Sequence, residues 1–114
     1  ILLQTNVSGE ETKHGFEPSE LSSVISELNG CSSIRVCGLM TMAPIQQYDG
    51  QALEGFTETK RIFDELKSVT KDPNCWTVLS MGMSQDFEAA IKAGCTHIRI
   101  GTSIFGNRQY IDVH

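Results

Sequence analysis

Residues 78–110 read VLSMGMSQDFEAAIKAGCTHIRIGTSIFGNRQY, and this stretch is the most informative part of the chain about fold and function. It contains two short apolar runs, each followed by a turn of small residues that opens a helix pattern. The first run ends at Ser80 and the second at Gly101 and Thr102. Such a turn presents free backbone N–H groups and the positive end of a helix dipole, which together favour a bound phosphate. Two of these turns on consecutive parallel strands are expected to converge on one anion.

The whole chain alternates between strand and helix patterns. Apolar strand patterns cover residues 1–7, 33–40, 76–80 and 97–101, and helix patterns cover residues 18–28, 51–69 and 85–93, with a short helix beginning at 102. Pro18 favours a first helical turn, Ser84 is a plausible N-cap, and Gly94 supplies a C-cap. Strands that alternate with helices of this length predict right-handed βαβ units and a parallel sheet.

The length of 114 residues fits one small domain or part of a larger one. About four βα units make half of a (β/α)8 barrel, which typically needs ~250 residues, and a barrel phosphate commonly sits in the loops after the last two strands. Because the chain begins inside an apolar strand without Met, we expect residues 1–114 to be the C-terminal half of a single α/β TIM-type barrel domain. Its open sheet edges predict marginal stability or self-association of the isolated chain.

Composition narrows the possible partners. The net charge of −5 and the scattered 9 basic residues argue against a nucleic-acid or anionic-membrane surface. No apolar stretch approaches the ~20 residues that span a bilayer. The 4 cysteines have no metal-ligand spacing, so we expect no metal site and reduced thiols in a cytosol-like compartment.

Four residues form the predicted phosphate cradle. Gly101 and Thr102 offer backbone N–H groups and a hydroxyl at a helix start, and glycine lets the main chain approach an anion closely. Ser80 and the Met81 N–H end the neighbouring strand and could supply the other side. An ordinary tight turn between strand and helix remains the alternative.

Arg99 is the most informative single residue. In an alternating strand it shares one face with His97 and Gly101, whereas the isoleucines at 98 and 100 suit the helix-packing side. Arg99 is therefore expected to point into the barrel near its C-terminal rim. A buried arginine needs an acceptor. A structural salt bridge with an acidic loop residue is one possibility, and a ligand is the other.

Four motifs together resemble the pyridoxal phosphate homeostasis proteins, relatives of the alanine racemase N-terminal barrel. They are SGEETKHG at 8–15, GLMTM at 38–42, LSMGMSQDF at 79–87 and RIGTSIFG at 99–106. The resemblance covers the chain nearly end to end and in order. It implies a barrel that binds pyridoxal 5′-phosphate without established catalytic turnover and that helps to balance intracellular vitamin B6.

The resemblance also implies roles for individual residues. Arg99 would contact the pyridine nitrogen, Ser80, Met81, Gly101 and Thr102 would hold the phosphate, and Asn6 could reach the ring; no catalytic residue is expected. The Schiff-base lysine of the family would lie in the missing N-terminal half, since the five lysines here fall in loop or helix patterns (Lys13, Lys60, Lys67, Lys71 and Lys92). Glu10, Glu11 and Lys13 could brace the site.

The parent protein is expected to be a cytoplasmic monomer, with a mitochondrial location also open, that could pass the cofactor to other B6 enzymes. Two further hypotheses remain. The barrel could be an enzyme, either a pyridoxal-phosphate-dependent racemase or an isomerase of a phosphorylated sugar. The chain could also be an inactive truncated product.

Overall fold

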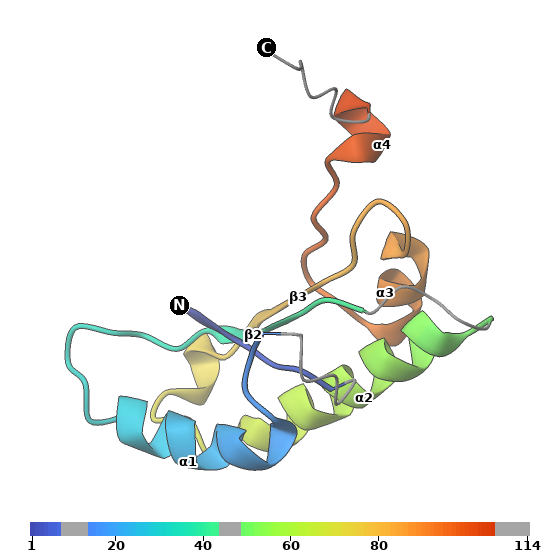
Figure 1. Cartoon of the computed structure of the whole chain (residues 1–114). Helices are drawn as coiled ribbons and strands as arrows, with labels where there is room; N and C mark the ends of the chain where they lie inside the picture. Colours follow the sequence, from blue (N-terminus) through green and yellow to red (C-terminus); the bar gives the residue numbers. More distant parts are fainter. Residues whose placement is uncertain (8–13, 44–48, 107–114) are drawn as a thin grey trace, which may run out of the picture.

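The computed structural model describes residues 1–7, 14–43 and 49–106. The elements follow the order β1 (Leu2–Gln4), α1 (Pro18–Leu28), β2 (Gly38–Thr41), α2 (Gln51–Leu66), the 3-10 helix η1 (Pro73–Cys75), β3 (Val78–Met81), α3 (Phe87–Ala93) and α4 (Thr102–Phe105). The strands pair in parallel in the order β1-β2-β3. Figure 1 shows α1 and α2 on one side of this sheet and α4 projecting away from it. The predicted parallel α/β architecture is confirmed.

The core lies between the sheet and its helices. Leu3, Leu39 and Leu79 are paired across the three strands, and all three are buried. Because side chains alternate along a strand, these leucines share the face that packs against the helices. From α1 the core receives Leu21 and Ile25, each fully buried, as the 3.6-residue spacing predicts.

Trp76 closes the core at the amino end of β3. Its indole is 2% exposed and stacks on the Phe63 ring of α2, with ring centroids 5.2 Å apart. The indole Nε1–H donates to the Phe63 carbonyl oxygen at 2.8 Å. The largest core side chain thus buries its apolar surface and satisfies its one polar group.

The strands are shorter than the apolar patterns predict. The expected strand at 33–40 begins only at Gly38, because its register with β1 starts at the pair Leu2 and Gly38. Before it, the Ile1 amine donates to the Arg35 carbonyl at 2.6 Å. Cys37 itself is held by the bond from its N–H to the Ile1 carbonyl. Similarly, β1 covers three of the seven residues predicted.

The predicted fourth strand is reduced to a single parallel bridge between Ser80 and His97. The His97 N–H donates to the Leu79 carbonyl, and the Met81 N–H donates to the His97 carbonyl. The next bond runs from the Arg99 N–H to the carbonyl of Gly82, one residue beyond the parallel register. Gly82 has a φ of 101°, and this left-handed residue interrupts the ladder.

Two helix boundaries also differ from the sequence prediction. α2 ends at Leu66 rather than at Val69, and Val69 closes a turn through its N–H to the Leu66 carbonyl. α3 begins at Phe87, so Ser84 is not its N-cap; that position is occupied by Asp86. The C-cap at Gly94 is confirmed, with a φ of 100°.

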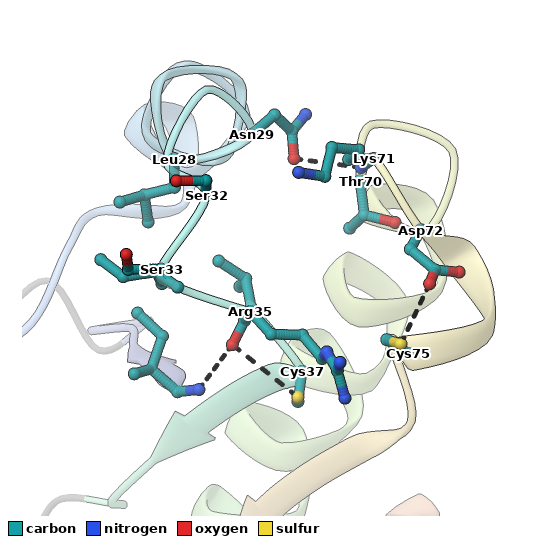
Figure 2. Close-up of a pocket in the computed structure, with 13 residues that line it drawn as sticks. Leu28, Asn29, Ser32, Ser33, Arg35, Cys37, Thr70, Lys71, Asp72 and Cys75 are labelled. Carbon is teal, nitrogen blue, oxygen red and sulfur yellow. Dashed lines mark hydrogen bonds between the residues drawn. The ribbon is translucent and has the colours of Figure 1, made fainter.

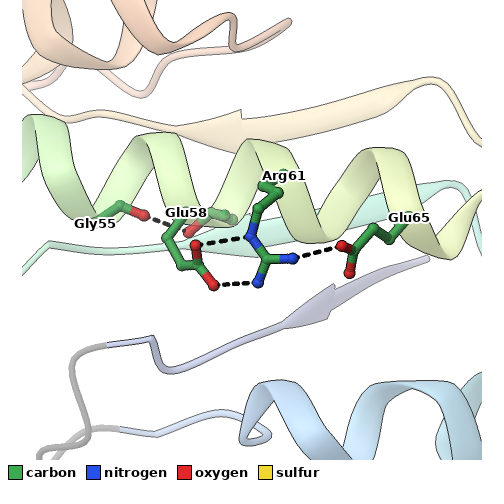
Figure 3. A network of polar contacts seen from close by, with 5 residues as sticks. Gly55, Glu58, Arg61 and Glu65 are labelled. Atoms are coloured by element: carbon green, nitrogen blue, oxygen red, sulfur yellow. Dashed lines mark hydrogen bonds and ion pairs between the residues drawn. The ribbon is translucent and has the colours of Figure 1, made fainter.

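The exposed face of α2 carries a chain of ion pairs (Figure 3). Arg61 bonds to both Glu58 and Glu65, as Figure 3 shows. A separate pair joins Lys60 Nζ to Asp64 Oδ1 at 2.7 Å. The bonds to Arg61 hold the pKa of the Glu58 carboxyl below its ordinary value. These pairs have the spacing of neighbours on a helix surface.

Several predicted features lie outside the described residues. They include most of the 8–15 motif, with the proposed bracing residues Glu10, Glu11 and Lys13, and the chain after Gly106. Within the described ranges, no helix has both the length and the apolar character needed to cross a membrane.

Candidate functional site

The candidate site lies at the carboxyl edge of the sheet, where hydrogen bonds link the strand ends laterally. The Thr41 hydroxyl at the end of β2 donates to the Thr5 carbonyl at 2.9 Å, next to β1. The Arg99 guanidinium donates from Nη2 to the Thr41 carbonyl at 2.7 Å. The Arg99 N–H binds Gly82, which follows β3. Residues from four successive segments therefore meet at one edge.

Arg99 is the cation of this edge. Its Nε atom is buried and has no hydrogen-bond partner among the described residues. Burial lowers the pKa of the guanidinium below its ordinary value, while the nearby Asp86 carboxylate acts in the opposite direction. The ion pairs of the described chain all lie on α2 and do not include Arg99. Arg99 thus combines a partly desolvated charge with one buried donor that lacks an acceptor.

The two turns predicted to converge do meet. The N–H of Gly101, at the start of α4, donates to the hydroxyl of Ser84 at 3.3 Å. Ser84 lies in the turn between β3 and α3, where the Met83 N–H also donates to Asp86 Oδ1 at 2.8 Å. Ser84, which the sequence marked only as a helix cap, is therefore a member of the site.

Gly101 and Thr102 form the open part of the site. Both are exposed, and a Cβ placed on Gly101 would meet no atom within 4 Å. The first hydrogen bonds within α4 come from the N–H groups of Ile104 and Phe105 to the Gly101 carbonyl. The N–H groups of Gly101 and Thr102 precede these bonds, so they point away from the body of the helix.

Ser80 and Met81 occupy different environments. Ser80 is 6% exposed and points away from the core leucines, on the same side as its cross-strand neighbour Met40. Met81 is fully buried on the helix side. Its N–H is used by the His97 carbonyl at 3.1 Å, so the expectation that this N–H holds a phosphate is corrected.

Asn6 and His97 flank the site. The Asn6 N–H, just beyond β1, donates to the Phe16 carbonyl, which places this residue at the same edge as Thr41. His97 is exposed, and its Nδ1 lies 2.8 Å from the Thr96 hydroxyl. The predicted strand places His97 on the same face as Arg99, but His97 is exposed because the segment forms only one bridge to β3.

The described lysines lie on helices or in the segment after α2, as the sequence predicts, and Lys92 lines a small pocket together with Ser84 and Asp86. Lys60 is on α2, Lys92 is on α3, and Lys67 and Lys71 follow α2. Arg99 is the cation that bonds to a strand end at the carboxyl edge.

A separate cavity of about 660 Å³ lies at the opposite end of the sheet. Figure 2 shows its walls, which include Arg35, Cys37 and Cys75. The Cys75 thiol donates to Asp72 Oδ2 at 3.1 Å, and this bond is the main cause of a raised pKa of the thiol. The cavity shares no residue with the carboxyl edge.

Known proteins match this chain over nearly its whole length. A sequence model described as "Alanine racemase, N-terminal domain" matches residues 1–109. The pyridoxal phosphate homeostasis protein of Aquifex aeolicus is 40% identical over 96% of this chain and 47% of its own length. The human protein of that name is 38% identical over 96% of this chain and 41% of its own length.

Solved structures show the same relationship. A protein of unknown function from Bifidobacterium adolescentis superposes with a TM-score of 0.82 and 34% identity, covering 91% of this chain and 42% of that one. PipY of Synechococcus elongatus with PLP bound superposes with a TM-score of 0.75 and 29% identity, covering 92% and 48%.

The chain spans about half the length of the relatives that it matches, which agrees with the expected half of a barrel. The matched residues include the strand ends and turns that build the site. The chain therefore belongs to the family of the alanine racemase N-terminal domain, within which it is similar to the pyridoxal phosphate homeostasis proteins.

Proposed function

We propose that this chain supplies part of a pyridoxal 5′-phosphate site in a protein of intracellular vitamin B6 homeostasis. The observation that carries the proposal is the buried Arg99 Nε, which has no acceptor within residues 1–7, 14–43 and 49–106, at the edge where Ser84 and Gly101 meet. A buried donor without a partner costs about 1–3 kcal/mol. A ligand that brings an acceptor to this place removes that cost. The names of the relatives and the PLP-bound PipY structure support the choice of ligand.

The pyridine nitrogen of the cofactor fits Arg99. It carries a lone pair, and an arginine side chain is a donor only. Bound pyridoxal phosphate supplies a ring that can draw electrons from an attached substrate. An arginine that leaves the ring nitrogen unprotonated weakens this property, so the contact suits storage of the cofactor better than catalysis. We accordingly propose a non-catalytic role in the cytoplasm, including transfer of the cofactor to B6 enzymes.

The phosphate fits the turn region beside Arg99. Thr102 offers its N–H group at an open turn, and the hydroxyls of Ser80, Ser84 and Thr102 are candidates for further bonds. The Gly101 N–H donates to the Ser84 hydroxyl at 3.3 Å and would have to exchange this acceptor for the phosphate. Backbone N–H groups at a helix start favour a dianion. Asn6, at the β1 end of the same edge, is the candidate for a contact to the ring.

Binding of pyridoxal phosphate, followed by isothermal titration calorimetry, tests the proposal. Arg99→Gln should weaken binding about tenfold or more, since a hydrogen bond to a charged group contributes about 1.5–3 kcal/mol. Arg61→Gln, on the exposed face of α2, is the matched control and should bind like the wild type. Absence of binding by the wild-type chain, or equal loss in both variants, would contradict the proposal.

A further inference from the structure

The orientation of Arg99 depends on one backbone atom. The guanidinium reaches over the end of β3 to the carbonyl oxygen of Thr41, the last residue of β2, and binds it through Nη2 at 2.7 Å. The guanidinium is planar and its N–H groups have a fixed relative geometry. Fixing Nη2 therefore restricts the directions open to Nε, the buried donor without a partner.

Thr41 is held on both sides, but by different means. On the β3 side it is paired with Met81 at the end of the β2–β3 ladder. On the β1 side the ladder stops one pair earlier, at Gln4 and Met40. Beyond that point the Thr41 hydroxyl donates to the Thr5 carbonyl at 2.9 Å, and both threonines are almost completely buried. The hydroxyl extends the connection to β1 by one residue, to the residue whose carbonyl holds Arg99.

We propose that Thr41 is a positioning residue for Arg99: its hydroxyl fixes the end of β2, its carbonyl fixes Nη2, and Nε is thereby directed toward the ligand. Thr41 itself does not touch the ligand. The inference rests on the proposed function for the identity of that ligand, whereas the link between Thr41 and Arg99 is a property of the protein alone.

The first experiment follows the Arg99 Nε–H signal by NMR in the ligand-free chain. Thr41→Val keeps the size of the side chain and removes the hydroxyl. It should shift this signal and speed its exchange with water about tenfold, the effect of losing roughly one hydrogen bond. Thr41→Ser keeps the hydroxyl and should restore the wild-type signal. If Thr41→Val does not fold, Thr41→Cys, with a weaker donor of similar size, takes its place.

Thr59→Val is the matched control. Thr59 is also completely buried, and its hydroxyl bonds to a carbonyl, that of Gly55, at 2.8 Å within α2. This variant measures the general effect of removing a buried threonine hydroxyl. An Arg99 signal that is unchanged by the Thr41 substitution, or changed equally by Thr59→Val, overturns the proposal.

The second experiment compares two ligands by calorimetry. Thr41→Val should weaken pyridoxal phosphate binding about tenfold through Arg99 but leave binding of inorganic phosphate unchanged, because the phosphate turn does not depend on Thr41. Equal weakening of both ligands would show a general structural effect and refute the positioning role. If the wild-type chain binds neither ligand, the proposed function fails, while the NMR experiment still decides the role of Thr41.

Discussion

The Arg99 guanidinium is bonded to the carbonyl oxygen of Thr41, 58 residues earlier in the chain, at 2.7 Å. This contact connects the segment after α3 to β2 across the end of β3. The regular strand ladder does not make this connection, since the segment carries only one bridge. A side chain that we propose to contact the ligand thus also links the segment after α3 to β2.

Gly38→Ala should strongly destabilise the fold. A Cβ at this position would lie 1.6 Å from the Val78 carbonyl oxygen, and the φ of Gly38 is 156°. Relieving this overlap requires separation of β2 from β3, with an expected loss of about 3 kcal/mol in the free energy of unfolding. Urea denaturation measures the loss.

Gly55→Ala in α2 is the control for Gly38→Ala. Its Cβ would contact Val7 at an ordinary 3.8 Å. Because alanine has the higher helix propensity, this variant should be more stable by about 0.5–1 kcal/mol. A Gly38 variant as stable as the wild type would show that the two strands do not approach as closely as described.

Ser84→Ala should weaken binding of inorganic phosphate by about fivefold, because the contact between the two turns through Gly101 is lost and a hydroxyl is removed from the site. The free energy of unfolding should change little, because water can replace the Ser84 hydroxyl as the acceptor of the exposed Gly101 N–H. Ser68→Ala, which removes an exposed hydroxyl bonded to the Glu65 carbonyl, is the control. Equal phosphate affinity of both variants argues against a role for Ser84.

The thiols of Cys75 and Cys95 should react slowly with iodoacetamide at about pH 8, because the thiolate is the reactive form. The bond to Asp72 raises the pKa of Cys75, and burial raises the pKa of Cys95. Asp72→Asn keeps the oxygen that accepts the Asn74 N–H but removes the charge, so it should accelerate alkylation at Cys75 only. Mass spectrometry of the labelled peptides gives both rates; unchanged labelling of Cys75 would refute the role of Asp72.

Arg61→Gln should lower the melting temperature slightly at neutral pH and low salt. The pKa of Glu58 is depressed in the folded state, so its contribution is present above the ordinary value of 4.5 and is lost as the pH falls through the folded-state value. The pair is exposed and therefore screened. The difference in melting temperature between Arg61→Gln and the wild type should vanish in acid and in about 1 M salt. A difference in melting temperature that persists under both conditions would show that the arginine stem stabilises the fold by packing instead.

The sequence predicts what local patterns determine. The spacing of Leu21 and Ile25 places α1 on the core, Gly94 ends α3, and the alternation of strands and helices gives a parallel sheet. Strand lengths are less predictable, because a strand ends where its neighbour ends. The apolar run before Gly38 reads as a strand, but its pairing with β1 begins at Gly38, and before that point Ile1 makes single bonds to Arg35 and Cys37.

The local parts of the candidate site can be predicted from the sequence, but the contacts between them cannot. The two turns are evident from their small residues, and Arg99 from its place in an alternating run. Their connections depend on the tertiary structure: the left-handed Gly82 shifts the register, and Asp86 takes the capping position expected for Ser84. Ser84 instead accepts the Gly101 N–H, a contact between two turns that no local pattern shows.

Trp76 is the only tryptophan of the chain, and it is stacked on Phe63 at the amino end of β3, whereas Arg99 and Gly101 lie beyond the carboxyl end. Its fluorescence is therefore an intrinsic probe of the folded core, located at the opposite end of β3 from the proposed ligand site. Titration of a chromophoric cofactor and unfolding of the domain can be recorded as two distinct signals on the same unlabelled sample.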